Sequence, residues 1–308
     1  MARASFQAEA PGKLMLMGEH AVLHGRRALV CAINRRWRVT LRPRTDGRVV
    51  IVSALGRLDL PLENLAPRPP FAFILAALSA RRAQLPGGCD LAVEADSDAV
   101  HGLGSSSAVT VATVAALRAW LGEPVADREA LFAESVCAVR AAQGRASGAD
   151  VAAGVYGGVL AYRMTPCEAT PLGRALPLVV AASGHKEATT DVVARVERGR
   201  ADFPRLYDGI YDLMDACVGE AIAAIAAEDW PRLGRLVNLH QGLMDALGLV
   251  NPPLAALVQR LRALPGVHGA KVSGAGLGDC VYGIGSAAPS AAAGLLDLSV
   301  SPYGVRVS

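Results

Sequence analysis

The feature that most constrains this chain is a glycine- and serine-rich loop that leads directly into an apolar helical stretch. It reads His-Gly-Leu-Gly-Ser-Ser-Ser-Ala over 101–108, and Val-Thr-Val-Ala follows at 109–112. Glycines let a backbone approach a ligand closely, and serines cap helices. The free N–H groups of a first helical turn, with the helix dipole behind them, favour an anion. The loop therefore predicts a phosphate site, although an ordinary capped helix would have the same residues.

Composition and charge place the chain in the globular class. Its 308 residues are 52% hydrophobic and 19% charged, and 31 basic against 28 acidic residues give a formal net charge of +3. That near balance predicts no nucleic-acid partner. No apolar run approaches the ~18 residues of a membrane span, so we expect no membrane partner. Six scattered cysteines without CxxC or zinc spacing predict reduced thiols in a cytoplasmic protein.

Hydrophobic periodicity predicts an α+β chain in which strands dominate the first half and helices the second. Expected strands cover about 28–42, 49–52, 90–95, 157–163 and 176–182, and two more surround a glycine-rich loop within 270–284. Expected helices cover about 71–84, 105–121, 128–143, 190–198, 203–227, 231–247 and 253–264. We divide the chain into two lobes, 1–168 and 169–308.

Three further segments carry residues suited to chemistry. The segment 10–25 reads Ala-Pro-Gly-Lys-Leu-Met-Leu-Met-Gly-Glu-His-Ala-Val-Leu-His-Gly, which gathers Lys13, Glu19 and His20 between glycines. The segment 144–150, Gly-Arg-Ala-Ser-Gly-Ala-Asp, is a loop that delivers Asp150. The segment 271–279, Lys-Val-Ser-Gly-Ala-Gly-Leu-Gly-Asp, is a glycine-rich loop between two strands.

Together with the serine loop, these segments resemble the GHMP kinase superfamily in order and spacing over nearly the whole chain. The first is similar to that family's PGK motif, the serine loop to its GLGSS phosphate loop, and the last to its C-terminal GAG motif. The resemblance implies a two-lobed fold, with an N-terminal lobe like ribosomal protein S5 domain 2, a ferredoxin-like C-terminal lobe, and ATP in the cleft between them. It also implies a transferase that moves a phosphoryl group from ATP to an alcohol with Mg²⁺.

Within that superfamily the chain resembles the mevalonate kinases of isoprenoid biosynthesis. The Gly-Glu-His-Ala-Val at 18–22 followed by Gly25, and the stretch 238–248, are similar to segments of those enzymes. The stretch 144–158 and Gly-Asp-Cys at 278–280 look instead like phosphomevalonate kinases. One position departs from the mevalonate kinase pattern, because Val139 stands eleven residues before Asp150, where a Mg²⁺-binding glutamate is typical.

The resemblance implies a role for each motif residue. Asp150 would accept or orient the proton of the substrate hydroxyl, and Lys13 would counter transition-state charge. Gly102, Leu103, Gly104, Ser105, Ser106 and Ser107 would hold the ATP phosphates, and Ser106, with Glu19 as a second candidate, would bind Mg²⁺. The implied substrate contacts are His20, Glu19, Thr189, Ser147, Gly274, Ala275 and Gly276.

Two alternatives to a mevalonate kinase stay open. A phosphomevalonate kinase needs basic side chains at the acceptor site, for which Arg140, Arg145, Lys186 and Lys271 are candidates. A catalytically silent metabolite-binding protein of the same fold would be expected to lose Lys13, Asp150 or the phosphate loop, and all three are present. Homodimers are common in the family, so the resemblance also implies a homodimer as a candidate assembly.

Overall fold

The computed structural model describes residues 5–96, 103–173, 175–185, 187–288 and 293–308, which form two lobes around two sheets. The larger sheet has the strand order β11-β1-β2-β5-β3-β4, and β6 and β7 extend it from β2. Its strands are β1 (Phe6–Met17), β2 (Ala28–Pro43), β3 (Arg48–Ser53), β4 (Gly56–Pro61), β5 (Cys89–Ala95), β6 (Val159–Arg163), β7 (Glu168–Gly173) and β11 (Arg306–Val307).

The long strand β2 organises this sheet. It pairs with β1 along most of its length, and its two halves pair with different neighbours on the other side. Residues 28–31 of β2 pair with β6, and residues 37–43 pair with β5. The β1–β2 register slips between Pro11 and Lys13, where the strand bulges. The bulge lies one residue before Lys13, so it influences where that side chain emerges.

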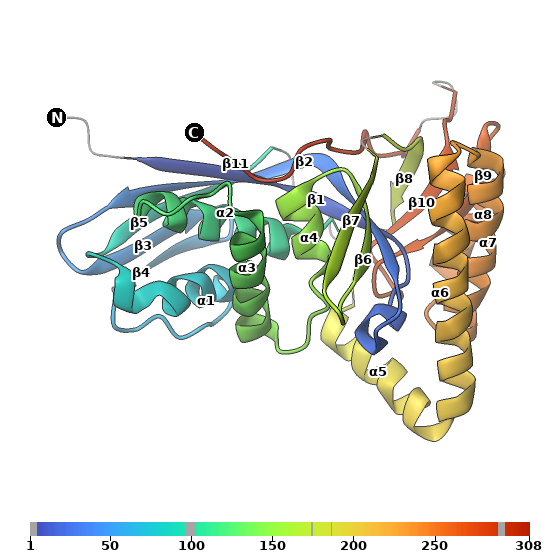
Figure 1. Ribbon diagram of the computed structural model, residues 1–308, viewed down its shortest axis with the longest axis horizontal. Helices are drawn as coiled ribbons and strands as arrows, with labels where there is room; N and C mark the ends of the chain where they lie inside the picture. Colours follow the sequence, from blue (N-terminus) through green and yellow to red (C-terminus); the bar gives the residue numbers. More distant parts are fainter. Residues whose placement is uncertain (1–4, 97–102, 174, 186, 289–292) are drawn as a thin grey trace.

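Four helices cover one face of the larger sheet (Figure 1). They are α1 (Ala72–Arg81), α2 (Ser105–Trp120), α3 (Arg128–Gln143) and α4 (Ala149–Tyr156), and the short 3-10 helices η1 (Ala21–His24) and η2 (Arg82–Gln84) connect the strands and helices around them. Helix α2 packs on β1 and β2, and its buried residues include small ones such as Ala112 and Ala115. Small side chains let the helix approach the sheet closely, which brings the α2 N-terminus next to Lys13.

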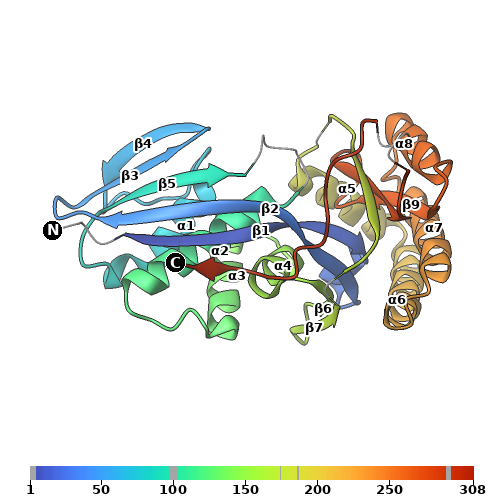
Figure 2. The same cartoon turned by 90° about the horizontal axis from the view of Figure 1, so that it is seen from above.

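The second lobe combines the smaller antiparallel sheet, order β8-β10-β9, with long helices. Figure 2 shows this lobe at the opposite end of the molecule from β3 and β4. Its elements are β8 (Leu178–Ala182), α5 (Thr189–Asp202), α6 (Pro204–Ala226), α7 (Trp230–Ala246), α8 (Pro252–Arg262), β9 (Val267–Ser273) and β10 (Cys280–Gly285). The α7 and α8 starts are capped by the side chains of Asp229 and Asn251, which accept N–H groups three residues on.

The end of β1 is held by the second lobe. Tyr282 donates its hydroxyl to the Leu16 carbonyl at 2.6 Å, and Ser273 donates to the Met15 carbonyl at 2.8 Å. Arg27, at the start of β2, is paired with Asp215 of α6 at 2.5 Å. The chain therefore carries residues 13–20 from the larger sheet directly into the joint between the lobes.

The α+β class predicted from the sequence is confirmed. The division at 168/169 stays a prediction. The two sheets separate between β7 and β8, and the last residues return to the first lobe, where β11 pairs with β1. None of the described helices combines the length and the apolar character needed to cross a membrane.

Candidate active site

Lys13 and the serine loop are locked together by two glycines. The Lys13 N–H donates to the Leu103 carbonyl at 2.8 Å. A Cβ on Gly12 would lie 2.3 Å from that carbonyl oxygen, so only glycine fits there. Gly104 precedes α2 with φ +77°, and its Cβ would lie 2.6 Å from Lys13 Cγ. The α2 N-terminus and the Lys13 side chain are therefore fixed relative to each other.

Of the expected phosphate-binding residues, Leu103, Gly104, Ser105, Ser106 and Ser107 are described, and Gly102 lies outside the described residues. Ser105 is the first residue of α2, and its N-cap residue Gly104 has no side chain to cap this end. The first-turn N–H groups therefore have no side-chain acceptor among the described residues. This arrangement is suited to an anion.

Asp150 lies against Lys13. Lys13 Nζ is 3.3 Å from Asp150 Oδ1, with 11% of the lysine side chain and 40% of the aspartate side chain exposed. Burial alone lowers the pKa of Lys13, but the carboxylates of Asp150, Asp279 and Glu19 outweigh it and raise that pKa above its usual 10.5. The lysine therefore stays cationic at neutral pH, while the carboxylate is open to a ligand.

Asp150 is held in place by the loop before α4. Gly148 adopts φ +94° immediately before the helix, and a Cβ there would lie 2.8 Å from the Tyr162 hydroxyl. That hydroxyl donates to the Ser147 carbonyl at 2.6 Å. Asp150 is the second residue of α4, so its carboxylate is also favoured by the helix N-terminus.

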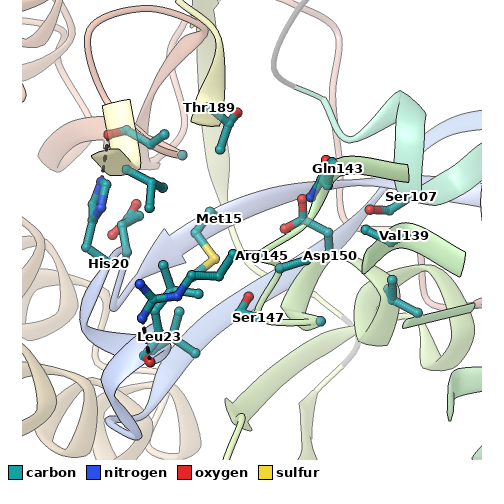
Figure 3. A pocket seen from close by; sticks show the side chains of 18 of the residues that line it. Met15, His20, Leu23, Ser107, Val139, Gln143, Arg145, Ser147, Asp150 and Thr189 are labelled. Carbon is teal, nitrogen blue, oxygen red and sulfur yellow. Dashed lines mark hydrogen bonds between the residues drawn. The ribbon is translucent and has the colours of Figure 1, made fainter. Parts of the chain in front are cut away.

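An open pocket, about 800 Å³ when the solvent at its mouth is included, lies beside this pair (Figure 3). The expected site residues that line it are Lys13, Glu19, His20, Ser107, Ser147, Asp150, Thr189, Gly274 and Ala275. Residues from both lobes thus converge on one cavity. The described lining of the pocket does not include the other expected site residues, which are Leu103, Gly104, Ser105, Ser106 and Gly276. A Cβ on Gly276 would lie 2.7 Å from that of Leu249, which gives this glycine a packing role.

Glu19 is engaged inside the joint between the lobes. Its Oε1 accepts from Lys271 Nζ at 2.6 Å, and both side chains are buried. Burial raises the pKa of Glu19 against the opposing effect of Lys271, and burial lowers the pKa of Lys271. Its Oε2 lies 3.8 Å from His240 Nε2, which accepts the Gly18 N–H at 2.9 Å. These contacts favour a structural role for Glu19, and its assignment as a Mg²⁺ ligand stays a prediction.

His20 has a defined tautomer. Its Nε2 lies 2.8 Å from the Ala275 carbonyl, and a carbonyl only accepts, so Nε2 carries a proton. Burial lowers the pKa of His20 below its usual 6.5, so the ring is neutral at pH 7 and Nδ1 holds a lone pair. The residue itself adopts φ +62°, an unusual conformation for histidine that aims the ring into the joint. His20 therefore presents an acceptor from Nδ1.

Helix α3 brings Val139 and Gln143, one turn apart, to the pocket wall. Figure 3 places both beside Asp150 and Ser107. The position of the missing acid is thus part of the site, and the buried Val139 offers no ligand to a metal there. Among the described residues no cluster of three or more His, Cys, Asp or Glu side chains has metal-binding spacing.

Sequence reasoning did not assign several pocket residues. Arg145 lies in the loop before Asp150, and Asp279 in the glycine-rich loop 274–279, but neither was given a role in the predicted mevalonate site. Apolar residues complete the wall, namely Met15, Val22, Leu23, Val151 and Val193. Arg145 and Asp279 could have been found from the sequence, because each lies in one of the motif segments. The apolar wall had none, because aliphatic residues of this kind also fill ordinary cores.

Comparisons with known proteins agree with the motifs. Residues 72–158 match the family model described as GHMP kinases N terminal domain, and residues 221–296 match that of GHMP kinases C terminal. The chain is 37% identical to the mevalonate kinase of Aeropyrum pernix over 92% of its own length and 89% of that protein. In fold it is similar to L. major mevalonate kinase in complex with R-mevalonate (TM-score 0.76, 23% identity, 96% of each chain). It is also similar to Streptococcus pneumoniae phosphomevalonate kinase in complex with phosphomevalonate and AMPPNP (TM-score 0.79, 19% identity, 96% and 99% of the chains).

Proposed function

The chain belongs to the GHMP kinase family and, within it, to the mevalonate kinases, and we propose that its inter-lobe pocket transfers the γ-phosphoryl group of ATP to the 5-hydroxyl of mevalonate. The observation that carries this proposal is the Lys13–Asp150 pair, at 3.3 Å beside the α2 N-terminus. A general base, a cation and an anion-binding helix end then meet at one point. Phosphoryl transfer needs this kind of positioning and charge neutralisation more than covalent chemistry.

In this proposal Asp150 accepts the proton of the attacking hydroxyl, and its exposed edge is where that hydroxyl docks. Lys13 is already held by Asp150, so its charge lies next to the reacting oxygen without reorganisation. The raised pKa of Lys13 keeps that charge in place throughout the neutral range. Ser147 and Thr189 line the same pocket and offer hydroxyls to the substrate.

The ATP phosphates belong at the start of α2. The residues proposed to hold them are Gly102, Leu103, Gly104, Ser105, Ser106 and Ser107, through backbone N–H groups and serine hydroxyls. Gly104 keeps that backbone against Lys13, so phosphate bound here lies next to the cation. Ser107 reaches both this helix end and the acceptor pocket.

Mg²⁺ fits the oxygen donors at this end of the pocket. Ser106, at the adjoining start of α2, and the side-chain carbonyl of Gln143 would hold the ion together with water and phosphate oxygens, which Mg²⁺ retains readily. When bound, the ion neutralises charge on the phosphates. The loss of an acid at Val139 reduces the protein's own share of the coordination. A homodimer and a cytoplasmic location also stay predictions, the latter supported by six cysteines that are free thiols.

The choice of acceptor is tested by following ADP release with ATP, Mg²⁺ and either mevalonate or 5-phosphomevalonate. The proposal predicts turnover of mevalonate alone. The fold itself is compatible with both acceptors, because phosphomevalonate kinase is as similar in backbone as mevalonate kinase. Turnover of 5-phosphomevalonate alone would therefore move the enzyme to the alternative acceptor and leave the Lys13–Asp150 chemistry intact.

A further inference from the structure

We propose that Arg145 binds the carboxylate of the substrate and so determines that the enzyme selects an anionic alcohol; this rests on the proposed function. Mevalonate carries its reacting hydroxyl at one end and a carboxylate at the other. The hydroxyl belongs at Asp150, so the carboxylate must lie farther along the pocket. A carboxylate that leaves water needs a cationic or well-placed donor partner.

Two permanent cations occur among the described residues that line the pocket, Lys13 and Arg145. Lys13 is held at the reacting end by Asp150 at 3.3 Å. Figure 3 shows the Arg145 guanidinium on the side of the pocket where His20 lies, with Asp150 and Ser107 on the other side. Among the described residues, Arg145 is thus the cation available to the far end of the substrate; Lys186 lies outside them.

His20 does not replace it in this role. Its Nε2 proton is used by the Ala275 carbonyl at 2.8 Å, and the neutral ring offers only the lone pair of Nδ1. A lone pair repels a carboxylate and accepts from a hydroxyl. We therefore assign His20 to a hydroxyl of the substrate and the carboxylate to the Arg145 guanidinium.

Two contacts hold the Arg145 side chain and leave part of its guanidinium available for a ligand. Its NH1 lies 3.1 Å from Glu197 Oε1 of α5, and its NH2 donates to the Leu23 carbonyl at 3.4 Å. Glu197 is itself fixed by His24 at 2.9 Å. A guanidinium has five N–H donors, and these described contacts leave others for a ligand. The arginine side chain is 48% exposed, so its free edge is accessible from the pocket.

The pocket wall agrees with this orientation. Met15, Val22, Leu23 and Val193 supply apolar surface. The methyl and methylene groups between the two polar ends of mevalonate match such a wall. Arg145 lies in the loop directly before α4 and Asp150 in its first turn, so one short segment sets the spacing between the carboxylate and hydroxyl subsites.

The test compares Arg145→Gln with the parent enzyme and with Arg195→Gln as the matched control. Arg195 is also an exposed arginine paired with a glutamate, 3.6 Å from Glu187, but it does not line the pocket. The measured quantities are kcat, the KM values for mevalonate and ATP, and the inhibition constant of the neutral carboxamide analogue of mevalonate. Thermal unfolding of each variant checks that the fold is retained.

Losing one charged hydrogen-bonding partner should raise the mevalonate KM about 10- to 100-fold in Arg145→Gln. We expect kcat and the ATP KM to change less than about threefold, because Arg145 contacts neither the reacting oxygen nor the phosphates. The carboxamide should bind parent and variant alike, and Arg195→Gln should match the parent.

A mevalonate KM within about threefold of the parent would overturn the inference, and so would an equal weakening of the carboxamide. A parent protein that does not turn over mevalonate would instead overturn the proposed function on which it rests.

Discussion

Replacing Gly104 by alanine should remove most of the activity by displacing Lys13. The new Cβ would lie 2.6 Å from Lys13 Cγ and 3.2 Å from its backbone nitrogen. Ordinary carbon–carbon contact begins near 3.5 Å, so the lysine must move by about 1 Å. A displacement of that size at a catalytic group costs about 100-fold in rate. The φ of +77° adds about 1–2 kcal/mol of backbone strain, which lowers stability but does not itself affect catalysis.

Gly122, at the other end of α2, provides the matched control. It has φ +72°, and its Cβ would meet nothing within 4 Å. Gly122→Ala therefore carries the same strain without the contact. We expect both variants to lose about 1–2 kcal/mol in urea unfolding, and only Gly104→Ala to lose about 100-fold in kcat for ADP release.

Adding the substitution Lys13→Met separates the lysine from other effects of the loop. If the loss passes through Lys13, Gly104→Ala should cost little further kcat in the Lys13→Met background, because interacting sites are not additive. Equal kcat values, within about threefold, for Gly104→Ala and Gly122→Ala would refute the reasoning.

Two further predictions concern the joint between the lobes. Lys271→Met leaves the buried Glu19 carboxylate without its partner at 2.6 Å and should lower the free energy of unfolding by about 3–5 kcal/mol. Adding Glu19→Gln should restore most of that stability. Urea unfolding that finds no recovery in the double variant would contradict the pairing. Burial lowers the pKa of His240 well below 6.5, so the unfolded chain binds a proton that the folded chain does not. Stability should therefore be full above pH 6.5 and fall below it by about 1.4 kcal/mol per pH unit for each such proton. His240→Gln should reduce that slope, and an unchanged slope would count against this assignment.

The sequence predicted the chemical motifs better than the local structure that carries them. The expected strands begin at residue 28, yet β1 (Phe6–Met17) is a twelve-residue strand of the sheet, between β11 and β2. Pro11 and Gly12 obscured it, because both are rare within regular strands. The structure accommodates them at the bulge where the β1–β2 register shifts. Helix α4 (Ala149–Tyr156) was not predicted: the segment 144–150 was interpreted as a loop and 151–156 was left unassigned, since eight residues are too few to establish a helical period.

The long-range pairs had no local signal. Glu19 and Lys271 are 252 positions apart, and each stands in a motif that suggested ligand contact. Only the fold shows that they neutralise each other. Arg145 and Glu197 meet across the lobes in the same way, and Glu197 belongs to a charged helix face that the sequence gives no reason to single out. Pairing between residues of the two lobes depends on how the lobes pack, and the hydrophobic periodicity of the sequence carries no information about that packing.

The most direct test of the account is Asp150→Asn, assayed for ADP release with ATP, Mg²⁺ and mevalonate beside Asp191→Asn. Asp191 is an exposed aspartate in the first turn of α5 and does not line the pocket. The account predicts a kcat loss of about 100- to 10,000-fold for Asp150→Asn with nucleotide binding retained, and full activity for Asp191→Asn. An Asp150→Asn enzyme that keeps more than about one tenth of the parent kcat would contradict the central claim that this carboxylate handles the proton of the attacking hydroxyl.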